Sequence, residues 1–295
     1  MESDDEIRAA LQAANEKSGI VSRPKPVVKR TPAPEVDSNE VSDVVPKPAP
    51  PKTFAKPFRP TLRPPVPLLV VCDDGDWDGE TIRLRNERFV IGRNTGDFQL
   101  PNDGLVSSRH MEIIRVLSDG RFRWIVADLQ STHGVFFRFT SHQLNDQTEF
   151  LVGRSRFRFE NPDAIAPGTT DDGSAMIQTD GTIGWSDAPG VDRPPTLVEL
   201  VRQGLGSRIS LAGSEYWIGA DPQCVFCKPD DPFLELKHAK IHRHPKRGWV
   251  VENNKTANGV WVRKSQHVFD PAKEDQGNSV RFQIGEQQFK LMVQS

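Results

Sequence analysis

The sequence predicts an all-β protein in which two antiparallel β-sandwich domains are joined by a flexible linker and preceded by a disordered tail. Short segments that alternate apolar and polar residues, such as Phe122, Trp124 and Val126 on one face, are typical of half-buried strands. Gly, Asn and Asp residues punctuate these segments at intervals typical of sandwiches. The whole pattern recurs 125 to 132 residues further on, which indicates that the sandwich is duplicated.

Residues 1–65 are expected to form the tail. Between residues 21 and 65 the chain places 12 of its 24 prolines, and it carries nine Lys or Arg against four acidic residues. So few apolar residues cannot offset the entropy of ordering this segment. Ser3 and Glu6 have capping-box spacing, which allows a short helix near residues 3–18. This helix is either a frayed terminus or a docking helix for a partner.

Residues 66–163 are expected to form the first sandwich domain. Eight strands are expected, and turn residues such as Asn86, Asn94 and the Asp119-Gly120 pair separate them. The expected strands are Leu68–Cys72, Thr81–Arg85, Phe89–Gly92, Met111–Val116, Phe122–Val126, Gly134–Arg138, Glu149–Val152 and Arg156–Phe159.

Residues 164–195 are expected to be an acidic flexible linker, and residues 196–295 a second, degenerate copy of the first domain. Phe89-Val-Ile-Gly-Arg93 corresponds to Tyr216-Trp-Ile-Gly-Ala220. Ser131-Thr-His-Gly134 corresponds to Thr256-Ala-Asn-Gly259. The spacing of these segments varies only in the loops, as expected of a duplicated domain.

Three short motifs lie at the expected loops of the first sandwich: Gly92-Arg93, Ser107-Ser108-Arg109-His110, and Asp128-Leu-Gln-Ser-Thr-His-Gly134. In this order they resemble the Gly-Arg, Ser-x-x-His and Asp-x-x-Ser-x-Asn-Gly motifs of the forkhead-associated (FHA) domain family. The resemblance covers residues 66–163 and, in weaker form, residues 196–295. It implies a β-sandwich that binds phosphothreonine peptides through loops at one end and needs no cofactor.

The motif residues suit this chemistry. A phosphothreonine carries about −1.5 to −2 charge at neutral pH. The planar guanidinium of Arg93 offers paired donors to it, and Ser107 offers a short hydroxyl donor. By resemblance these two contact the phosphate, the structural positions of the motif are Gly92, His110 and Gly134, and His110 braces the loop from behind. The residues expected to bind the phosphopeptide are Arg93, Ser107, Ser108, Arg109, Thr132 and His133.

The chain departs from the family pattern at His133 and throughout the second copy. His133 replaces an Asn that holds the peptide backbone, and its donor and acceptor lie on opposite ring edges. In the second copy, Ala220 replaces the arginine and Glu235 replaces the serine, so a carboxylate would repel a phosphate. The second copy is therefore expected to be structural or to make a phosphate-independent protein contact.

Composition argues against several other functions. The formal net charge of −2 gives no whole-chain signature of nucleic-acid binding, and no apolar run is long enough to span a membrane. Three cysteines form no disulfide framework, which favours a reducing, cytoplasmic location. No catalytic motif is present, so no enzyme is predicted. The Cys224-x-x-Cys227 pair could bind zinc with His238, His242 and His244, but the repeat already accounts for these positions and no metal is predicted.

The sequence therefore predicts a non-enzymatic signalling adaptor that binds a phosphothreonine-containing protein, either a Ser/Thr kinase or its substrate, through the first domain. The alternative is a phosphate-independent interaction scaffold in which both sites are degenerate. Thr31, Thr169 and Thr170 in the tail and linker are potential intramolecular ligands if a kinase modifies them. Neither nucleic acid nor membrane is an expected partner.

Overall fold

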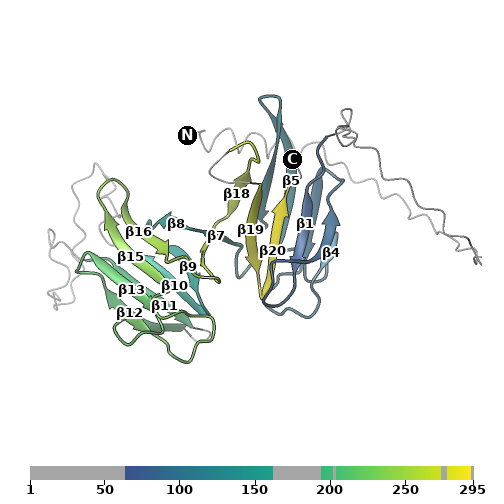
Figure 1. Ribbon diagram of the computed structural model, residues 1–295. Coiled ribbons are helices and arrows are strands. Elements are labelled where there is room, and N and C mark those ends of the chain that lie inside the picture. Colours follow the sequence, from purple (N-terminus) through teal and green to yellow (C-terminus); the bar gives the residue numbers. More distant parts are fainter. Residues whose placement is uncertain (1–63, 162–193, 202–203, 274–277, 294–295) are drawn as a thin grey trace, which may run out of the picture. The chain divides into compact units, whose positions relative to one another are not determined.

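The computed structural model of the chain describes residues 64–161, 194–201, 204–273 and 278–293 (Figure 1). These residues form β-strands and contain no helix, which confirms the all-β prediction. None of them belongs to a helix that could span a membrane. The helix expected near residues 3–18 lies outside the described residues, as do the expected tail and linker except for the last two residues of each.

The strands that precede the linker lie where the sequence predicts them. All eight expected strands are present, with ends shifted by at most two residues, and the short strands β4 and β8 are additions. The strands are β1 (Leu68–Cys72), β2 (Gly79–Arg83), β3 (Arg88–Gly92), β4 (Phe98–Gln99), β5 (Met111–Ser118), β6 (Arg121–Asp128), β7 (Phe136–Phe139), β8 (Ser141–Gln143), β9 (Thr148–Val152) and β10 (Ser155–Glu160).

The strands that follow the linker repeat this series. β13, β15 and β16 pair with one another as β3, β5 and β6 do, and β14 adds in parallel to β13 as β4 does to β3. The strands are β11 (Thr196–Val201), β12 (Gly204–Ser210), β13 (Glu215–Gly219), β14 (Phe226–Cys227), β15 (Ala239–His244), β16 (Gly248–Asn253), β17 (Val260–Arg263), β18 (Gln266–Phe269), β19 (Ser279–Ile284) and β20 (Gln287–Met292).

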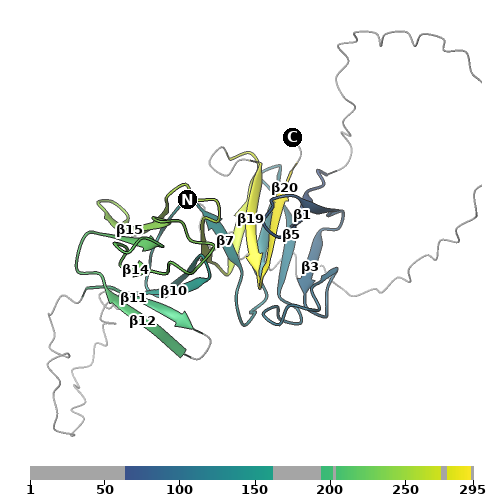
Figure 2. The ribbon, with the colours of Figure 1, turned by 60° about the horizontal axis from the view of Figure 1, so that its bottom comes forward.

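Each sandwich is assembled from both halves of the chain. β1 pairs with β20 and β6 with β18, whereas β11 pairs with β10 and β16 with β8. The colours of Figures 1 and 2 show this mixing, because the yellow strand β20 lies beside the blue strand β1. The last three strands of each half are therefore exchanged. We call β1–β7 with β18–β20 the first sandwich, and β8–β17 the second sandwich.

The sequence repeat does not predict this exchange. The expected domains, residues 66–163 and 196–295, each contribute strands to both sandwiches, and the chain from Pro65 onward forms one compact unit. β8–β10 and β18–β20 are equivalent in the repeat, so the strand pattern alone fits either assembly. The assignment of residues 66–163 and 196–295 as two repeated domains stays a prediction.

Short hinges account for the exchange. A single residue, Thr140, separates β7 from β8, and only Lys264 and Ser265 separate β17 from β18. Hinges this short leave little room for the chain to reverse, and strained short hinges favour the exchange of elements. At the crossing, β7 and β17 pair antiparallel with Phe137 opposite Val262, which joins the strands of both sandwiches into one ten-stranded sheet.

The two hydrophobic cores are mixed in the same way. In the first sandwich, Phe282 and Phe289 of the exchanged hairpin are fully buried beside Leu69. In the second, Phe150 and Phe157 pack in one cluster with strands that follow the linker. Burying one such side chain contributes about 1.5–3 kcal/mol. Separating the halves would therefore expose several aromatic rings and is strongly unfavourable.

Candidate functional site

The predicted site residues lie on three loops of the first sandwich, and backbone hydrogen bonds hold two of these loops together. Arg93 N donates to Ser107 O (2.9 Å), and Thr95 N donates to Ser108 O (3.0 Å). This close approach requires Gly92, because a Cβ at that position would lie 2.2 Å from Ser108 O. The loops span residues 93–97, 100–110 and 129–135.

His110 joins the second and third loops from the core side. Its ring is fully buried, its Nδ1 accepts a hydrogen bond from Ser107 N (3.0 Å), and its Nε2 lies 3.1 Å from Gly134 O. A backbone N–H can only donate, so Nδ1 is unprotonated and Nε2 carries the proton that Gly134 O accepts. Burial lowers the pKa of His110, which favours this neutral tautomer.

The Ser107 hydroxyl is oriented by the third loop. Its Oγ accepts a hydrogen bond from Thr132 N at 3.2 Å. This bond uses an oxygen lone pair and leaves the hydroxyl proton available to a ligand. Ser107 is half-buried and Thr132 is exposed. An anionic oxygen could therefore accept a hydrogen bond from Ser107 without disturbing the loop.

The third loop is closed by a compact turn. Ser131 N donates to Asp128 Oδ1 (3.0 Å), and Gly134 N donates to Ser131 Oγ (3.0 Å). Gly134 has a φ of +83°, in the left-handed region that favours glycine. Within the described residues the half-buried His133 side chain makes no hydrogen bond, so its ring nitrogens are available at the loop surface.

The two arginines of the motifs have different surroundings. Among the residues that the structure describes, the half-buried Arg93 guanidinium has no hydrogen-bond or ion-pair partner. Arg109, by contrast, lies 3.6 Å from the Glu112 carboxylate, which also pairs with Arg88 at 3.3 Å. Arg93 can therefore offer its full charge to an anion, whereas the charge of Arg109 is partly compensated.

The three loops, together with His110 that joins two of them, form a frame that we call the loop frame. It brings Arg93, Ser107 and Thr132 next to one another, and it adds Thr95, which the motifs do not indicate. Ser108 is exposed, and its Oγ lies 3.3 Å from Thr95 Oγ1. Thr95 follows Arg93 in a turn where many small polar residues would fit the sequence pattern, so no local signal marks it. The roles of these residues in ligand binding stay predictions.

The second sandwich repeats the structural frame of the first. Glu235 N donates to His238 Nδ1 (3.3 Å), and His238 Nε2 lies 2.9 Å from Gly259 O. His238 is fully buried, and burial lowers its pKa. Gly219 permits the same close approach, because a Cβ there would lie 2.2 Å from Leu236 O. The frame is thus independent of the anion-binding side chains.

In the second sandwich, the side chains at the positions equivalent to Ser107 and Arg93 differ in charge and in hydrogen-bonding capacity. Glu235 Oε1 accepts a hydrogen bond from Ala257 N (3.1 Å), the counterpart of the bond from Thr132 N to Ser107 Oγ. The carboxylate therefore replaces the serine as an acceptor, but it has no proton to donate and carries a negative charge. Ala220 in place of Arg93 removes the guanidinium.

The loop that carries Glu235 also presents two large hydrophobic side chains at the surface. Phe233 is 45% exposed and Leu236 is 68% exposed. Asn258 Nδ2 donates to Phe233 O (3.0 Å), which fixes the loop that presents them. The Arg154 guanidinium lies over the Phe233 ring, 5.0 Å from its centroid.

The residues considered as zinc ligands serve other contacts. Both ring nitrogens of His238 bind loop backbone, and the Cys224 thiol donates to Leu236 O (3.3 Å). Cys227 is exposed. Within the described ranges, no group of three or more His, Cys, Asp or Glu residues is placed to hold a metal ion.

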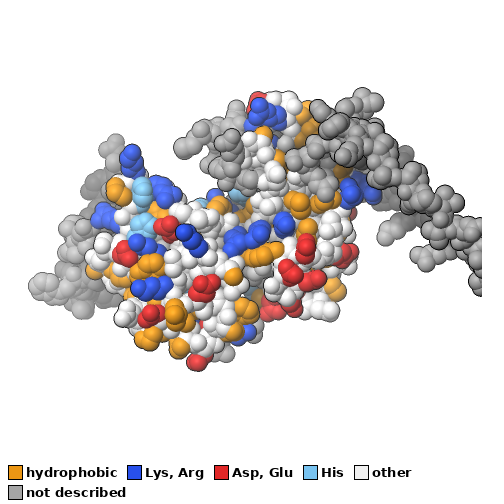
Figure 3. Space-filling model, in the orientation of Figure 1, with side chains coloured by type: hydrophobic (Ala, Val, Ile, Leu, Met, Phe, Trp, Pro, Cys, Tyr) orange, Lys and Arg blue, Asp and Glu red, His pale blue; other side chains and the backbone are white. Residues whose placement is uncertain are grey.

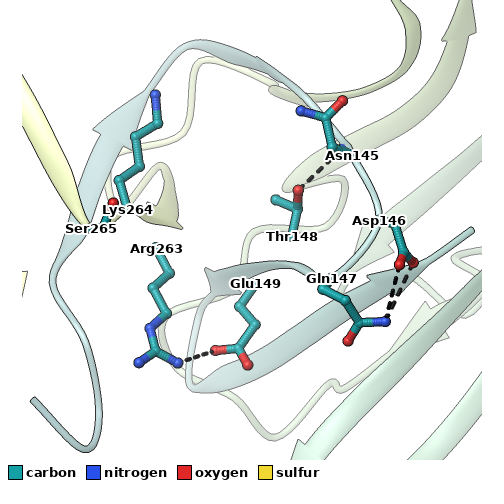
Figure 4. Close-up of a pocket in the computed structure, with 8 residues that line it drawn as sticks. All are labelled: Asn145, Asp146, Gln147, Thr148, Glu149, Arg263, Lys264 and Ser265. Carbon is teal, nitrogen blue, oxygen red and sulfur yellow. Dashed lines mark hydrogen bonds and ion pairs between the residues drawn. The ribbon is translucent and has the colours of Figure 1, made fainter. Parts of the chain in front are cut away.

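An open pocket of about 460 Å³ lies at the hinge between β17 and β18 (Figure 4). It is lined by the β8–β9 turn, by the start of β9 and by Arg263, Lys264 and Ser265. Figure 4 shows the Arg263 guanidinium directed at the Glu149 carboxylate, at 3.1 Å. None of the predicted site residues lines this pocket.

On the face in Figure 3, acidic and basic side chains are interspersed over both sandwiches.

Comparison with known protein families supports the interpretation of the three motif loops. A model of the FHA domain family matches residues 89–153, which include all three motifs. Residues 89–153 of the chain therefore belong to the forkhead-associated (FHA) domain family. It is similar to a solved structure described as "Structural and functional analysis of phosphothreonine-dependent FHA domain interactions", with 36% identity, a TM-score of 0.20, and coverage of 31% of this chain and 91% of that chain. No curated protein matches the chain.

FHA domains are protein-interaction modules whose interactions depend on phosphothreonine. The FHA match runs from β3 to the turn after β9, so it includes strands of both sandwiches. A second FHA domain after the linker stays a prediction, which the repeated His238 frame supports.

Proposed function

We propose that the protein is a non-enzymatic signalling adaptor that binds phosphothreonine-containing protein segments through the first sandwich. One observation carries the proposal. The Arg93 guanidinium, which has no partner among the described residues, and the available hydroxyl proton of Ser107 stand on adjacent loops, and a backbone hydrogen bond of 2.9 Å joins these two residues. This arrangement presents a fixed cation and a fixed donor, which together suit a phosphate dianion.

The energetics favour Arg93 as the principal contact. Each charge-assisted hydrogen bond contributes about 1.5–3 kcal/mol, and a guanidinium can make two to one phosphate. Because His110 already fixes the Ser107 loop, little conformational entropy is lost when the ligand binds. Ser108 and Thr132 border the same loops and supplement these contacts in the proposed complex.

The proposed partner is a phosphothreonine-containing protein of a Ser/Thr kinase pathway, either the kinase or its substrate, in the cytoplasm. Nucleic acid and membrane are not part of the proposal. Thr31, Thr169 and Thr170 lie outside the described residues, and a phosphorylated form of any of them would compete with an external partner as a tethered ligand.

Binding of a phosphothreonine peptide library, measured by fluorescence anisotropy, tests the proposal. Wild-type protein is expected to bind selected phosphorylated peptides and to ignore their unphosphorylated forms, while Arg93→Ala loses this binding. Arg93→Lys is expected to recover only part of it, because an ammonium lacks the planar fork. Arg121→Ala, a change at an exposed arginine of β6, is the matched control and should bind as wild type does. Absence of phosphate-dependent binding by wild-type protein would refute the proposal.

A second function, a phosphate-independent protein contact, is favoured at the second sandwich by the exposed Phe233 and Leu236 beside Glu235. An array of unphosphorylated peptides, probed with wild type and Leu236→Ser, tests it. Binding that is lost in Leu236→Ser but retained in Arg93→Ala would assign the contact to this loop. Equal binding by wild type and Leu236→Ser would exclude it.

A further inference from the structure

The loop that carries Ser107 is anchored by the other half of the chain. Asp103 Oδ1 accepts a hydrogen bond from Leu105 N (2.8 Å), and its Oδ2 accepts one from Glu286 N (2.7 Å). Glu286 lies in the turn of the exchanged β19–β20 hairpin. Both carboxylate oxygens are therefore engaged, and together they fix the start of the loop that leads to Ser107.

The contact between the hairpin turn and Asp103 is too close for a side chain at Gly285. This glycine has a φ of +55°, and a Cβ there would lie 2.1 Å from Asp103 Oδ2. Any larger residue at this position would displace the Asp103 carboxylate or distort the turn. The position of the Ser107 loop thus depends on the geometry of the exchanged hairpin.

The third loop of the site also rests on the other half. Arg263 of β17 packs against Gly134, where a Cβ would lie 2.2 Å from Arg263 Nε, and Lys264 N donates to Val135 O (3.0 Å). Glu149 holds the Arg263 guanidinium at 3.1 Å (Figure 4). Burial acts to raise the pKa of Glu149, but hydrogen bonds from Arg156 and then Arg263 outweigh it and lower that pKa, so the carboxylate stays ionised.

The equivalent turn of the first half acts on the second sandwich. Arg154 N donates to Asp231 Oδ2 (2.8 Å), and a Cβ on Gly153 would lie 2.5 Å from the same oxygen. In an unexchanged chain the two turns would trade places, and Arg154 rather than Glu286 would bind Asp103. The two turns therefore provide matched variants whose effects distinguish the two arrangements.

We propose that the second half of the chain positions the phosphothreonine site of the first, with Glu286 acting on the Ser107 loop and Arg263 acting on Gly134. The inference rests on the proposed function of that site. It gives a physical role to strands of the degenerate half: β17 supports the third loop, and β19 and β20 hold the second. Glu286 and Arg263 are positioning residues, because they act through their contacts with the loops.

Proline at the two turns tests the inference in the full-length protein. Glu286→Pro removes the N–H that binds Asp103 and is expected to weaken phosphothreonine-peptide affinity about tenfold, the effect of losing one hydrogen bond to a charged group. Arg154→Pro, the matched control, removes the equivalent N–H at Asp231 and is expected to change that affinity by less than about twofold. The reverse pattern, with Arg154→Pro harmful and Glu286→Pro neutral, would overturn the inference.

Hydrogen exchange measured by mass spectrometry provides a readout that needs no ligand. Glu286→Pro should accelerate exchange in residues 103–110 and leave residues 231–238 unchanged, and Arg154→Pro should do the opposite. If a proline variant fails to fold, Gly285→Ala and Gly153→Ala replace the pair, since each added Cβ meets the same carboxylates. Unchanged exchange in residues 103–110 for both Glu286→Pro and Gly285→Ala would refute the inference. A wild-type protein that binds no phosphopeptide, yet shows the expected exchange pattern, would refute only the proposed function.

Discussion

The two sandwiches share a loop frame but not the chemistry presented on it. In each, a buried histidine accepts a hydrogen bond from one loop and donates to the carbonyl of a turn glycine: His110 to Gly134, and His238 to Gly259. In the first sandwich this frame presents Ser107 beside Arg93, whereas in the second it presents Glu235 beside Ala220. This difference indicates that the fold requires the frame, whereas a few exposed side chains on the frame determine which ligand it can bind.

Ser107 and Glu235 show how one position separates these two roles. Each accepts the backbone N–H of the third loop, so each satisfies the frame. Only the serine retains a proton for a ligand. A substitution that exchanges one for the other should therefore change binding while the frame survives.

The largest expected effect is that of Ser107→Glu. The new carboxylate can accept from Thr132 N as Glu235 accepts from Ala257 N, but it repels a phosphate and removes a donor. Phosphothreonine-peptide affinity should fall by more than about 100-fold, with little change in the free energy of unfolding. Isothermal titration calorimetry and urea unfolding measure the two quantities. Glu235→Asp is the control and should leave peptide affinity unchanged. Retained binding by Ser107→Glu would contradict the assignment of Ser107.

A second prediction concerns the strands that the sandwiches exchange. Glu252 of β16 lies opposite Ser141 of β8, whereas an unexchanged chain would place Gln266 of β18 in that position. In a Cys227→Ser background, Ser141→Cys with Glu252→Cys should cross-link in most molecules, because directly opposite strand residues are within disulfide range. Mobility on a non-reducing gel and peptide mapping measure the link.

The matched pair for this experiment is Gln266→Cys with Glu252→Cys. It should remain largely unlinked in the exchanged chain. Efficient linking of this pair, with little linking of the first, would show that each half folds on itself.

The smallest expected effect is a pH dependence of stability at the crossing. His142 and His267 occupy equivalent positions in the two halves, and both rings pack on Phe139, with centroids 4.8 and 5.9 Å away. Burial lowers the pKa of each to about 4, and nearby Lys264 adds to both shifts, with Arg247 adding to that of His142. An unfolded histidine has a pKa of about 6.5. Between these values the unfolded chain binds protons that the folded chain does not, so stability falls as the pH falls.

We therefore expect full stability above about pH 7 and a loss of about 1–3 kcal/mol per histidine as the pH falls from about 6.5 towards 4. Thermal unfolding followed by circular dichroism across this range measures the loss. The double variant His142→Gln with His267→Gln should lose less stability over the same range. The remaining slope should come from His110 and His238, whose pKa values burial also lowers, and near pH 4 also from carboxylates such as Glu149, whose pKa the hydrogen bonds from Arg156 and Arg263 lower. A double variant as sensitive as wild type would contradict this account.

The sequence by itself determined the fold class, the eight strands of residues 66–163 and the three motif loops. These features depend on local rules: alternation as in Phe122 to Val126, turn residues such as Gly134, and hydrogen-bonding residue types at fixed spacing. It also indicated that Ala220 and Glu235 remove the anion chemistry from the second copy, because side-chain charge can be read without a structure.

Only the tertiary structure decided which half completes each sandwich. β8–β10 and β18–β20 have equivalent patterns and fit either partner, so local rules cannot choose between them. The choice depends on one-residue and two-residue hinges and on core packing, which act between residues far apart in the chain. For the same reason no sequence pattern marks Glu286 and Arg263 as neighbours of the Ser107 and Gly134 loops, since their role follows from where the exchanged fold places them.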